Sequence, residues 1–177
     1  MKKEPIEKND ILDKISALIY RKNTLEIVII NLSAFKKKVD RTKKPTIEKI
    51  KEYIAETITN ANLKQIFMAE LEAGNFDVFQ TQTITSLLAK LNDIAAIGTV
   101  IDLSLPLPLT DTDLREIVDQ LEEKLHTKII LDLKIDPSLL GGIVIKKDNY
   151  IFDASLKNHL KNYENEWVKS LHKAHKI

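Results

Sequence analysis

Asp153 and Ser155 are the residues of this chain whose types are best suited to hydrolytic chemistry. A serine hydroxyl becomes a nucleophile when a neighbouring base, usually histidine, takes its proton. No histidine can be assigned to a position beside Ser155 from the sequence. Serine or aspartate just before an apolar helical stripe is typical of a helix cap. We therefore interpret Asp153 or Ser155 as a cap and predict no catalytic residue.

The pair Gly141-Gly142 could in principle cradle a phosphate group. Phosphate-binding loops carry further glycines, or a lysine, at fixed spacing, and they open a helix. Here the pair precedes the β-branched run Ile143-Val144-Ile145, which predicts a strand. The glycines are therefore expected to supply backbone freedom at a turn, and no cofactor is predicted.

Two further groups could bind ligands. His172 and His175 are spaced to share a metal ion on one helical face, and the basic run from Lys36 to Lys44 could contact phosphates. The histidines have no third ligand, and the basic run lacks the interleaved aromatics of nucleic-acid sites. We predict no metal site and no nucleic acid partner. A small nucleic-acid- or metal-responsive regulatory domain is kept as the alternative function.

Composition excludes several classes of protein. The net charge is +1, cysteine is absent, and 44% of the residues are hydrophobic. A chain this close to neutral has no global field to attract nucleic acid or an anionic membrane. No apolar run approaches the roughly 20 residues that span a bilayer. We expect a soluble protein without direct membrane insertion, which meets a membrane only through a partner.

The elements that must position these residues differ between the two parts of the chain. Residues 1–97 show helical apolar spacing throughout, which predicts a bundle of five or six helices. The β-branched run Ile27–Ile30 falls inside the longest stripe and is expected to be helical. The stripes consist of Ile11, Leu12, Ile15, Leu18 and Ile19; then Leu25, Val28, Ile29, Leu32, Phe35 and Val39; then Ile47, Ile50, Ile54 and Ile58; then Leu63, Ile66, Phe67 and Leu71; and finally Ile84, Leu87, Leu88, Leu91 and Ile94.

Residues 98–177 alternate strands with helices. Apolar residues alternate with polar ones or prolines over 101–109 and again over 129–135, with a helical stripe between them. Strand, helix and strand in this order predict a crossover unit. A hairpin turning at Asp148-Asn149 and a final helix follow. The predicted fold class is α+β: an N-terminal all-α bundle, 1–97, and a small α/β domain, 98–177, with a mixed sheet, a hairpin and a C-terminal helix.

One segment resembles a known family, the delta subunit of F-type ATP synthases, which is called the oligomycin-sensitivity-conferring protein in mitochondria. That family carries an Asp-Pro-x-Leu-hydrophobic-Gly-Gly core, a hairpin, and Asp-x-Ser at the start of the last helix. The resemblance covers 99–167. It departs from the family at Asp148, where glycine is usual, and in lacking the family's Tyr-Ala-x-Ala-Leu opening helix. The matching residues are Asp136, Pro137, Leu139, Leu140, Gly141, Gly142, Asp153 and Ser155.

The resemblance implies a non-catalytic stator subunit of the peripheral stalk, which couples rotary torque to ATP synthesis and the accompanying ion transport. The implied partners are the N-terminal segments of the alpha subunits for the bundle and the b subunit for the α/β domain. One copy per complex is expected, without homo-oligomers, at the cytoplasmic face of a bacterial plasma membrane. The candidate partner contacts are Ile15, Leu18, Ile19, Ile94, Tyr163 and Trp167.

Overall fold

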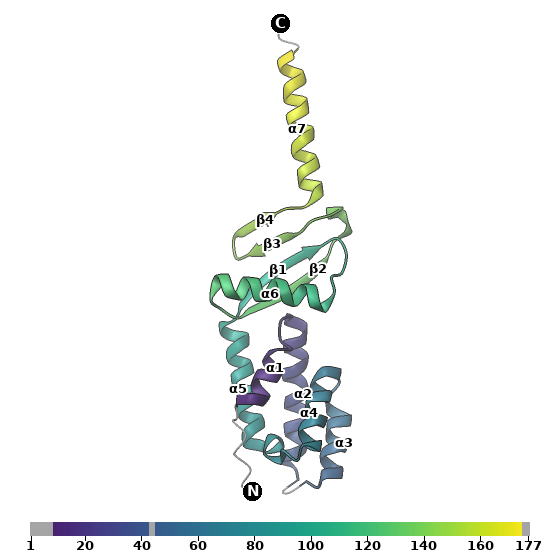
Figure 1. The fold of residues 1–177 in the computed structure, drawn as a ribbon, viewed down its shortest axis with the longest axis vertical. Coiled ribbons are helices and arrows are strands. Elements are labelled where there is room, and N and C mark those ends of the chain that lie inside the picture. The colour runs from purple at the N-terminus through teal and green to yellow at the C-terminus, as the bar shows by residue number, and fades with distance from the viewer. Residues whose placement is uncertain (1–8, 43–44, 175–177) are drawn as a thin grey trace. The chain divides into compact units, whose positions relative to one another are not determined.

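The computed structural model describes residues 9–42 and 45–174 (Figure 1). The chain divides into two compact units, Met1–Gly98 and Thr99–Ile177. The first unit is helical and the second contains a four-stranded mixed sheet, so the α+β fold class predicted from the sequence is confirmed.

The first unit is a bundle of helices around an aromatic centre. Phe35, Phe67 and Phe79 are fully buried or nearly so, and their rings meet edge to face with centroids 5.6–6.2 Å apart. Edge-to-face pairs at this separation add to the free energy of apolar burial. The helices are α1 (Asn9–Ser16), α2 (Lys22–Asp40), α3 (Ile47–Thr57), α4 (Ala61–Glu72), the 3-10 helix η1 (Phe76–Phe79) and α5 (Thr81–Ile97).

Helix α2 contains the β-branched run Ile27–Ile30, so the helical interpretation of that run is confirmed. The prediction that Leu18 and Ile19 continue the first helix is wrong, because α1 ends at Ser16. The amides of Leu18 and Ile19 donate to carbonyls three residues earlier, which tightens the chain into a turn. Ile19 is fully buried at this turn, which explains its apolar character without a helix.

Asn31 holds α2 against the corner between α3 and α4. Its side chain is buried, and its Oδ1 accepts hydrogen bonds from the backbone N–H groups of Thr59 (2.8 Å) and Asn60 (3.1 Å). Asn60 in turn caps α4, because its side chain accepts a hydrogen bond from the Leu63 amide at 2.9 Å. A buried amide satisfied in this way fixes the corner in one geometry.

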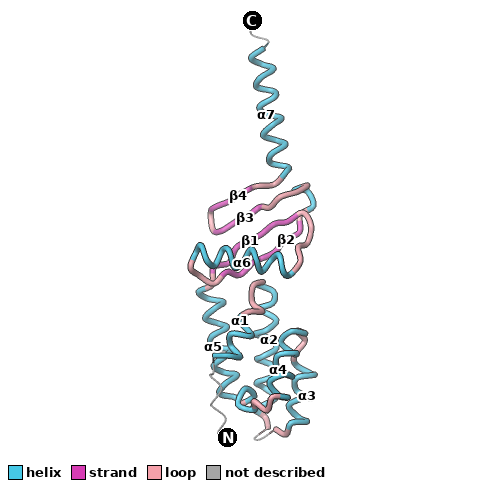
Figure 2. The backbone as a smooth tube through the Cα atoms, in the orientation of Figure 1, coloured by secondary structure: helices cyan, strands magenta, loops and turns pink. Residues whose placement is uncertain are grey.

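The second unit contains a sheet with the strand order β2-β1-β3-β4 (Figure 2). Strands β1 and β2 are parallel, joined through a helix as the crossover prediction requires, and β3 and β4 pair antiparallel beside β1. The elements are β1 (Thr99–Leu105), α6 (Asp111–Leu125), β2 (Ile129–Ile135), the 3-10 helix η2 (Pro137–Leu139), β3 (Val144–Lys147), β4 (Tyr150–Asp153) and α7 (Leu156–Ala174).

Helix α6 runs across one face of the sheet (Figure 1). Thr110 and Asp113 form a capping box at the start of α6, with the Thr110 Oγ1 accepting from the Asp113 amide at 3.2 Å. Leu114 and Val118 of α6 are buried, as are Ile101, Leu103 and Leu105 on alternate positions of β1. The strand stops at Leu105, so the following Pro-Leu-Pro lies beyond the sheet, as prolines favour.

The hairpin has the predicted register. Ile145 pairs with Phe152, and the chain reverses at Asp148, whose φ of 51° is a left-handed conformation that Asp tolerates. Phe152 is 63% exposed, so this side of the hairpin is open to solvent.

Candidate interaction surfaces

Residues 136–142 form a compact turn in the connection between β2 and β3. The Asp136 N–H donates to the Leu105 carbonyl at 2.7 Å, which ties the turn to the end of β1. The Asp136 Oδ1 accepts from the Ser138 amide at 3.1 Å, and Pro137 opens η2. Hydrogen bonds from the Ser138 side chain and backbone lower the pKa of Asp136. Leu139 is buried beneath the turn, whereas Leu140 is exposed.

The two glycines have different roles. Gly142 has a φ of +73°, and a Cβ built on it would lie 2.1 Å from the Ala154 carbonyl oxygen. Only glycine permits that approach. Gly141 would place a Cβ 3.6 Å from the Leu156 side chain, an ordinary contact. On either side of this close approach, Ala154 N–H donates to Ile143 O and Leu156 N–H donates to Gly141 O, both at 2.9 Å. The glycines therefore dock the start of α7 on the turn.

Asp153 and Ser155 complete this junction as caps. The Asp153 Oδ1 accepts from the Ser155 amide at 2.9 Å, and the Ser155 Oγ accepts from the Asn158 amide at 3.2 Å. Hydrogen bonds from the Ser155 hydroxyl and its backbone lower the pKa of Asp153. Ser155 is 1% exposed, so its hydroxyl is engaged in the cap and closed to a substrate. This geometry supports the capping interpretation and gives no nucleophile.

The stripe of α7 lies on the surface. Leu156 and Leu160 are about half exposed, while Tyr163 and Trp167 are 70% and 74% exposed. The side chains of Tyr163 and Trp167 are therefore largely accessible to solvent within this unit. Sequence reasoning missed the adjoining hairpin surface, because alternation alone does not tell which face of a strand is covered.

The contacts expected in the first unit lie at different depths. Ile15 and Ile19 are fully buried in the core, so a partner would reach them only if the turn after α1 moved. Leu18 and Ile94 are half-buried at the surface. Ile97 is 78% exposed at the end of α5. Of the candidate residues in this unit, Leu18 and Ile94 are the ones that a partner can touch directly.

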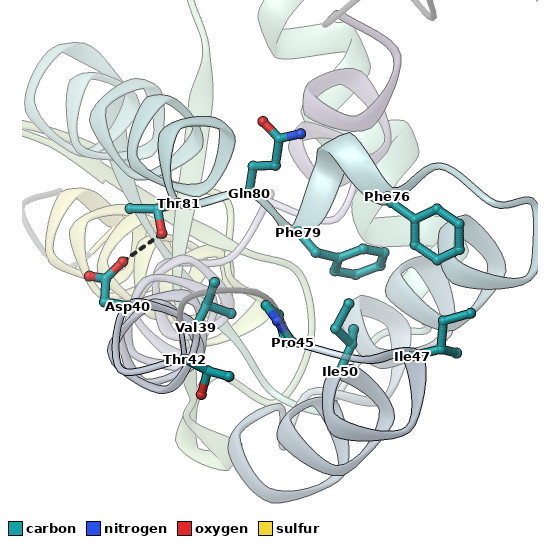
Figure 3. Close-up of a pocket in the computed structure, with 10 residues that line it drawn as sticks. All are labelled: Val39, Asp40, Thr42, Pro45, Ile47, Ile50, Phe76, Phe79, Gln80 and Thr81. Carbon is teal, nitrogen blue, oxygen red and sulfur yellow. Dashed lines mark hydrogen bonds between the residues drawn. The ribbon is translucent and has the colours of Figure 1, made fainter.

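The first unit also has an open pocket of about 790 Å³ between the end of α2, the start of α3 and η1 (Figure 3). The Thr81 hydroxyl donates to Asp40 at 2.6 Å at its edge. Hydrogen bonds from Lys36 and Thr81 lower the pKa of Asp40, which keeps this carboxylate charged. The lining is Val39, Asp40, Thr42, Pro45, Ile47, Ile50, Phe76, Phe79, Gln80 and Thr81.

The alternative of a nucleic-acid- or metal-responsive domain gains little from the structure. Lys36 pairs with Asp40 at 2.8 Å and Lys38 pairs with Glu56 at 2.7 Å, so acidic groups pair with two of the six basic residues of the run. Lys43, Lys44, His175 and the His172 side chain lie outside the described residues. Within the part of the chain that is described, no three His, Asp or Glu side chains are grouped to hold a metal ion.

Together these features define a two-unit α+β protein whose exposed apolar side chains suit protein–protein contacts. No helix among the described residues has the length and apolar character needed to cross a bilayer. The family model described as ATP synthase delta (OSCP) subunit matches residues 48–166, which span about half of the first unit and most of the second. The chain therefore belongs to the ATP synthase delta (OSCP) subunit family.

Bacterial relatives named ATP synthase subunit delta are similar to this chain. The chain is 37% identical to that of Persephonella marina over 59 residues, covering 33% of this chain and 32% of the relative. It is 33% identical to that of Xanthobacter autotrophicus over 98 residues, covering 51% and 49%. The match to Natranaerobius thermophilus is 23% identical over 175 residues, covering 95% and 89%. The chain thus spans a third to a half of the first two relatives, whereas the third match runs nearly end to end.

Proposed function

We propose that this chain is a non-catalytic connector in the peripheral stalk of an F-type ATP synthase. It links the catalytic head to the membrane-anchored b stalk, so that rotor torque drives ATP synthesis and does not spin the head. The observation that carries the proposal is the family match over residues 48–166.

The two units divide the work. The N-terminal unit binds the N-terminal segments of the alpha subunits, and the C-terminal unit binds the distal end of the b subunit. Exposed apolar residues in each unit support this division, with Ile97 in the first and Tyr163 and Trp167 in the second. One copy serves each complex, at the cytoplasmic face of a bacterial plasma membrane.

A stator joint must stay closed while torque acts on it. Such a joint therefore needs a slow dissociation rate, and the dissociation rate is where affinity differences among related complexes mainly lie. Helices seated on apolar surfaces through side chains at i, i+3, i+4 and i+7 provide this long residence.

The test is affinity purification of the tagged full chain from detergent-solubilised native membranes, with mass spectrometry of the co-purifying proteins. We expect alpha, beta and b subunits to be recovered together. Recovery of nucleic acid, or of an unrelated complex without these subunits, would contradict the proposal and favour the regulatory alternative.

A further inference from the structure

The exposed stripe of α7 has the period of a coiled-coil seam. Its apolar residues Leu156, Leu160, Tyr163 and Trp167 follow one another at intervals of four, three and four residues. This is the 3.5-residue period at which two helices supercoil around each other. All four residues are on the surface, with exposures that rise from 47% at Leu156 to 74% at Trp167.

The width of the stripe indicates what covers it. A helix that packs on a domain core presents an apolar face wider than two positions per heptad, whereas a strict a/d stripe is the narrower seam of a coiled coil. In the described part of α7, the residues beside the seam are charged or polar and exposed. A single helix is therefore the occupant that the stripe fits, in preference to a sheet or a globular surface.

The charges beside the seam change sign along the helix. With Leu160 at position a and Tyr163 at position d, Lys157 and Glu164 occupy successive e positions and Glu166 occupies a g position. Residues at e and g face the partner helix and select its register and orientation. The first heptad thus presents a basic flank and the second an acidic one.

We infer that α7 forms a two-helix coiled coil with a partner helix whose flanks carry the inverse pattern. That helix is acidic where it passes Lys157 and basic where it passes Glu164 and Glu166. The inference rests on the proposed function in one respect, namely that a stalk helix meets this unit. It adds the geometry of the contact and the chemistry that selects the register.

A second copy of this chain is a poorer occupant. A parallel copy in register carries the same flanks, basic at Lys157 and acidic at Glu164 and Glu166, and so does not present the inverse pattern. An antiparallel copy would oppose unlike charges but would contribute only the same short stripe. Isolated coiled coils generally need three or four heptads. Tyr150 and Phe152 of the hairpin are further exposed apolar residues of the same unit.

The test uses the full chain and three synthetic helical peptides without tryptophan, which share one leucine stripe of about three heptads. One peptide has a block of glutamate flanks followed by a block of lysine flanks, one has glutamate flanks only, and one has lysine flanks only. Trp167 is the only tryptophan of the chain, so its fluorescence reports burial of the seam directly. We expect the mixed peptide to bind roughly tenfold more tightly than either uniform peptide at low ionic strength, with less difference in high salt.

A single charge reversal should switch that preference. Lys157→Glu makes both flanks acidic, so the variant should bind the lysine peptide most tightly. Lys161→Glu is the matched control, because it makes the same change at a b position away from the partner, and it should keep the wild-type order. Equal binding of all three peptides to the wild type, or equal effects of the two reversals, would overturn the inference.

A seam-breaking variant separates this inference from the proposed function. Leu160→Glu should abolish peptide binding while far-UV circular dichroism stays unchanged, because Leu160 is half exposed. In the purification from native membranes, this variant should lose the b subunit and keep the alpha subunit. Retention of both would overturn the inference alone, whereas a wild-type chain that recovers neither would overturn the proposed function. A wild-type dimer in sedimentation that Leu160→Glu dissociates would assign the seam to a second copy.

Discussion

Replacing Gly142 by alanine should break the junction at the start of α7. The new Cβ would lie 2.1 Å from the carbonyl oxygen of Ala154 and 3.1 Å from the Cα of Ser155, both of them backbone atoms. Backbone cannot rotate away as a side chain can. The chain must therefore separate at the place where Ala154 N–H donates to Ile143 O and Leu156 N–H donates to Gly141 O.

The magnitude follows from these contacts. Each lost backbone hydrogen bond costs about 1 kcal/mol net. Alanine at a φ of +73° adds about 1 kcal/mol of left-handed strain. We expect the second unit to lose about 3 kcal/mol of stability, which is a large share of the total for a small domain.

Amide hydrogen exchange measured by NMR is the assay, because it reports opening at single residues. At about 1.4 kcal/mol per factor of ten, exchange at Ala154 and Leu156 should accelerate on the order of a hundredfold. Amides of the aromatic centre around Phe67 belong to the other unit and should keep their wild-type rates.

Gly141→Ala is the matched control, because it adds the same methyl group one residue earlier. Its Cβ would meet Leu156 at 3.6 Å, and its φ is outside the left-handed range, so exchange should change less than about threefold. Gly74→Ala, at a φ of +77° with the Phe76 side chain in ordinary contact at 3.9 Å, isolates the cost of strain without a clash. If Gly142→Ala resembled either control, the close approach to Ala154 would not be what holds α7.

Two further outcomes are expected. Asn31→Ala removes the acceptor of two backbone amides at the corner between α3 and α4, so the first unit should lose about 2 kcal/mol in urea unfolding; an unchanged midpoint would mean that water replaces the amide. In the folded state, hydrogen bonds lower the pKa of Asp153 below its ordinary value of 3.8. The Asp153 carboxylate therefore stabilises α7 fully above pH 3.8. This stabilisation is lost as the pH falls from 3.8 towards the folded-state pKa. The helicity of α7 in the wild type should therefore decrease on acidification, and Asp153→Asn should flatten this dependence; an identical acid profile in both proteins would refute the assignment.

The local elements of this protein follow from its sequence. The apolar stripes with a 3.6-residue period predict the helices of the bundle, and the alternation over 129–135 predicts β2. The strand–helix–strand order predicts the crossover that pairs β2 with β1 in parallel. A helix cap at Asp153 or Ser155 could also be predicted, and the Ser155 side chain accepts a hydrogen bond from a backbone amide only three residues away. In each case the signal lies within a few residues, which is the range over which periodicity and capping act.

The tertiary structure decided which apolar residues are buried. Ile15 and Trp167 both lie on helical stripes, yet Ile15 is fully buried and Trp167 is 74% exposed. A stripe states that a helix has an apolar face, but what covers that face depends on segments distant in the chain. Two further features depend on segments distant in the chain. Position 142 requires glycine because of the Ala154 carbonyl, and Asn31 is buried where it accepts from the amides of Thr59 and Asn60. These features depend on long-range packing, which no local pattern encodes.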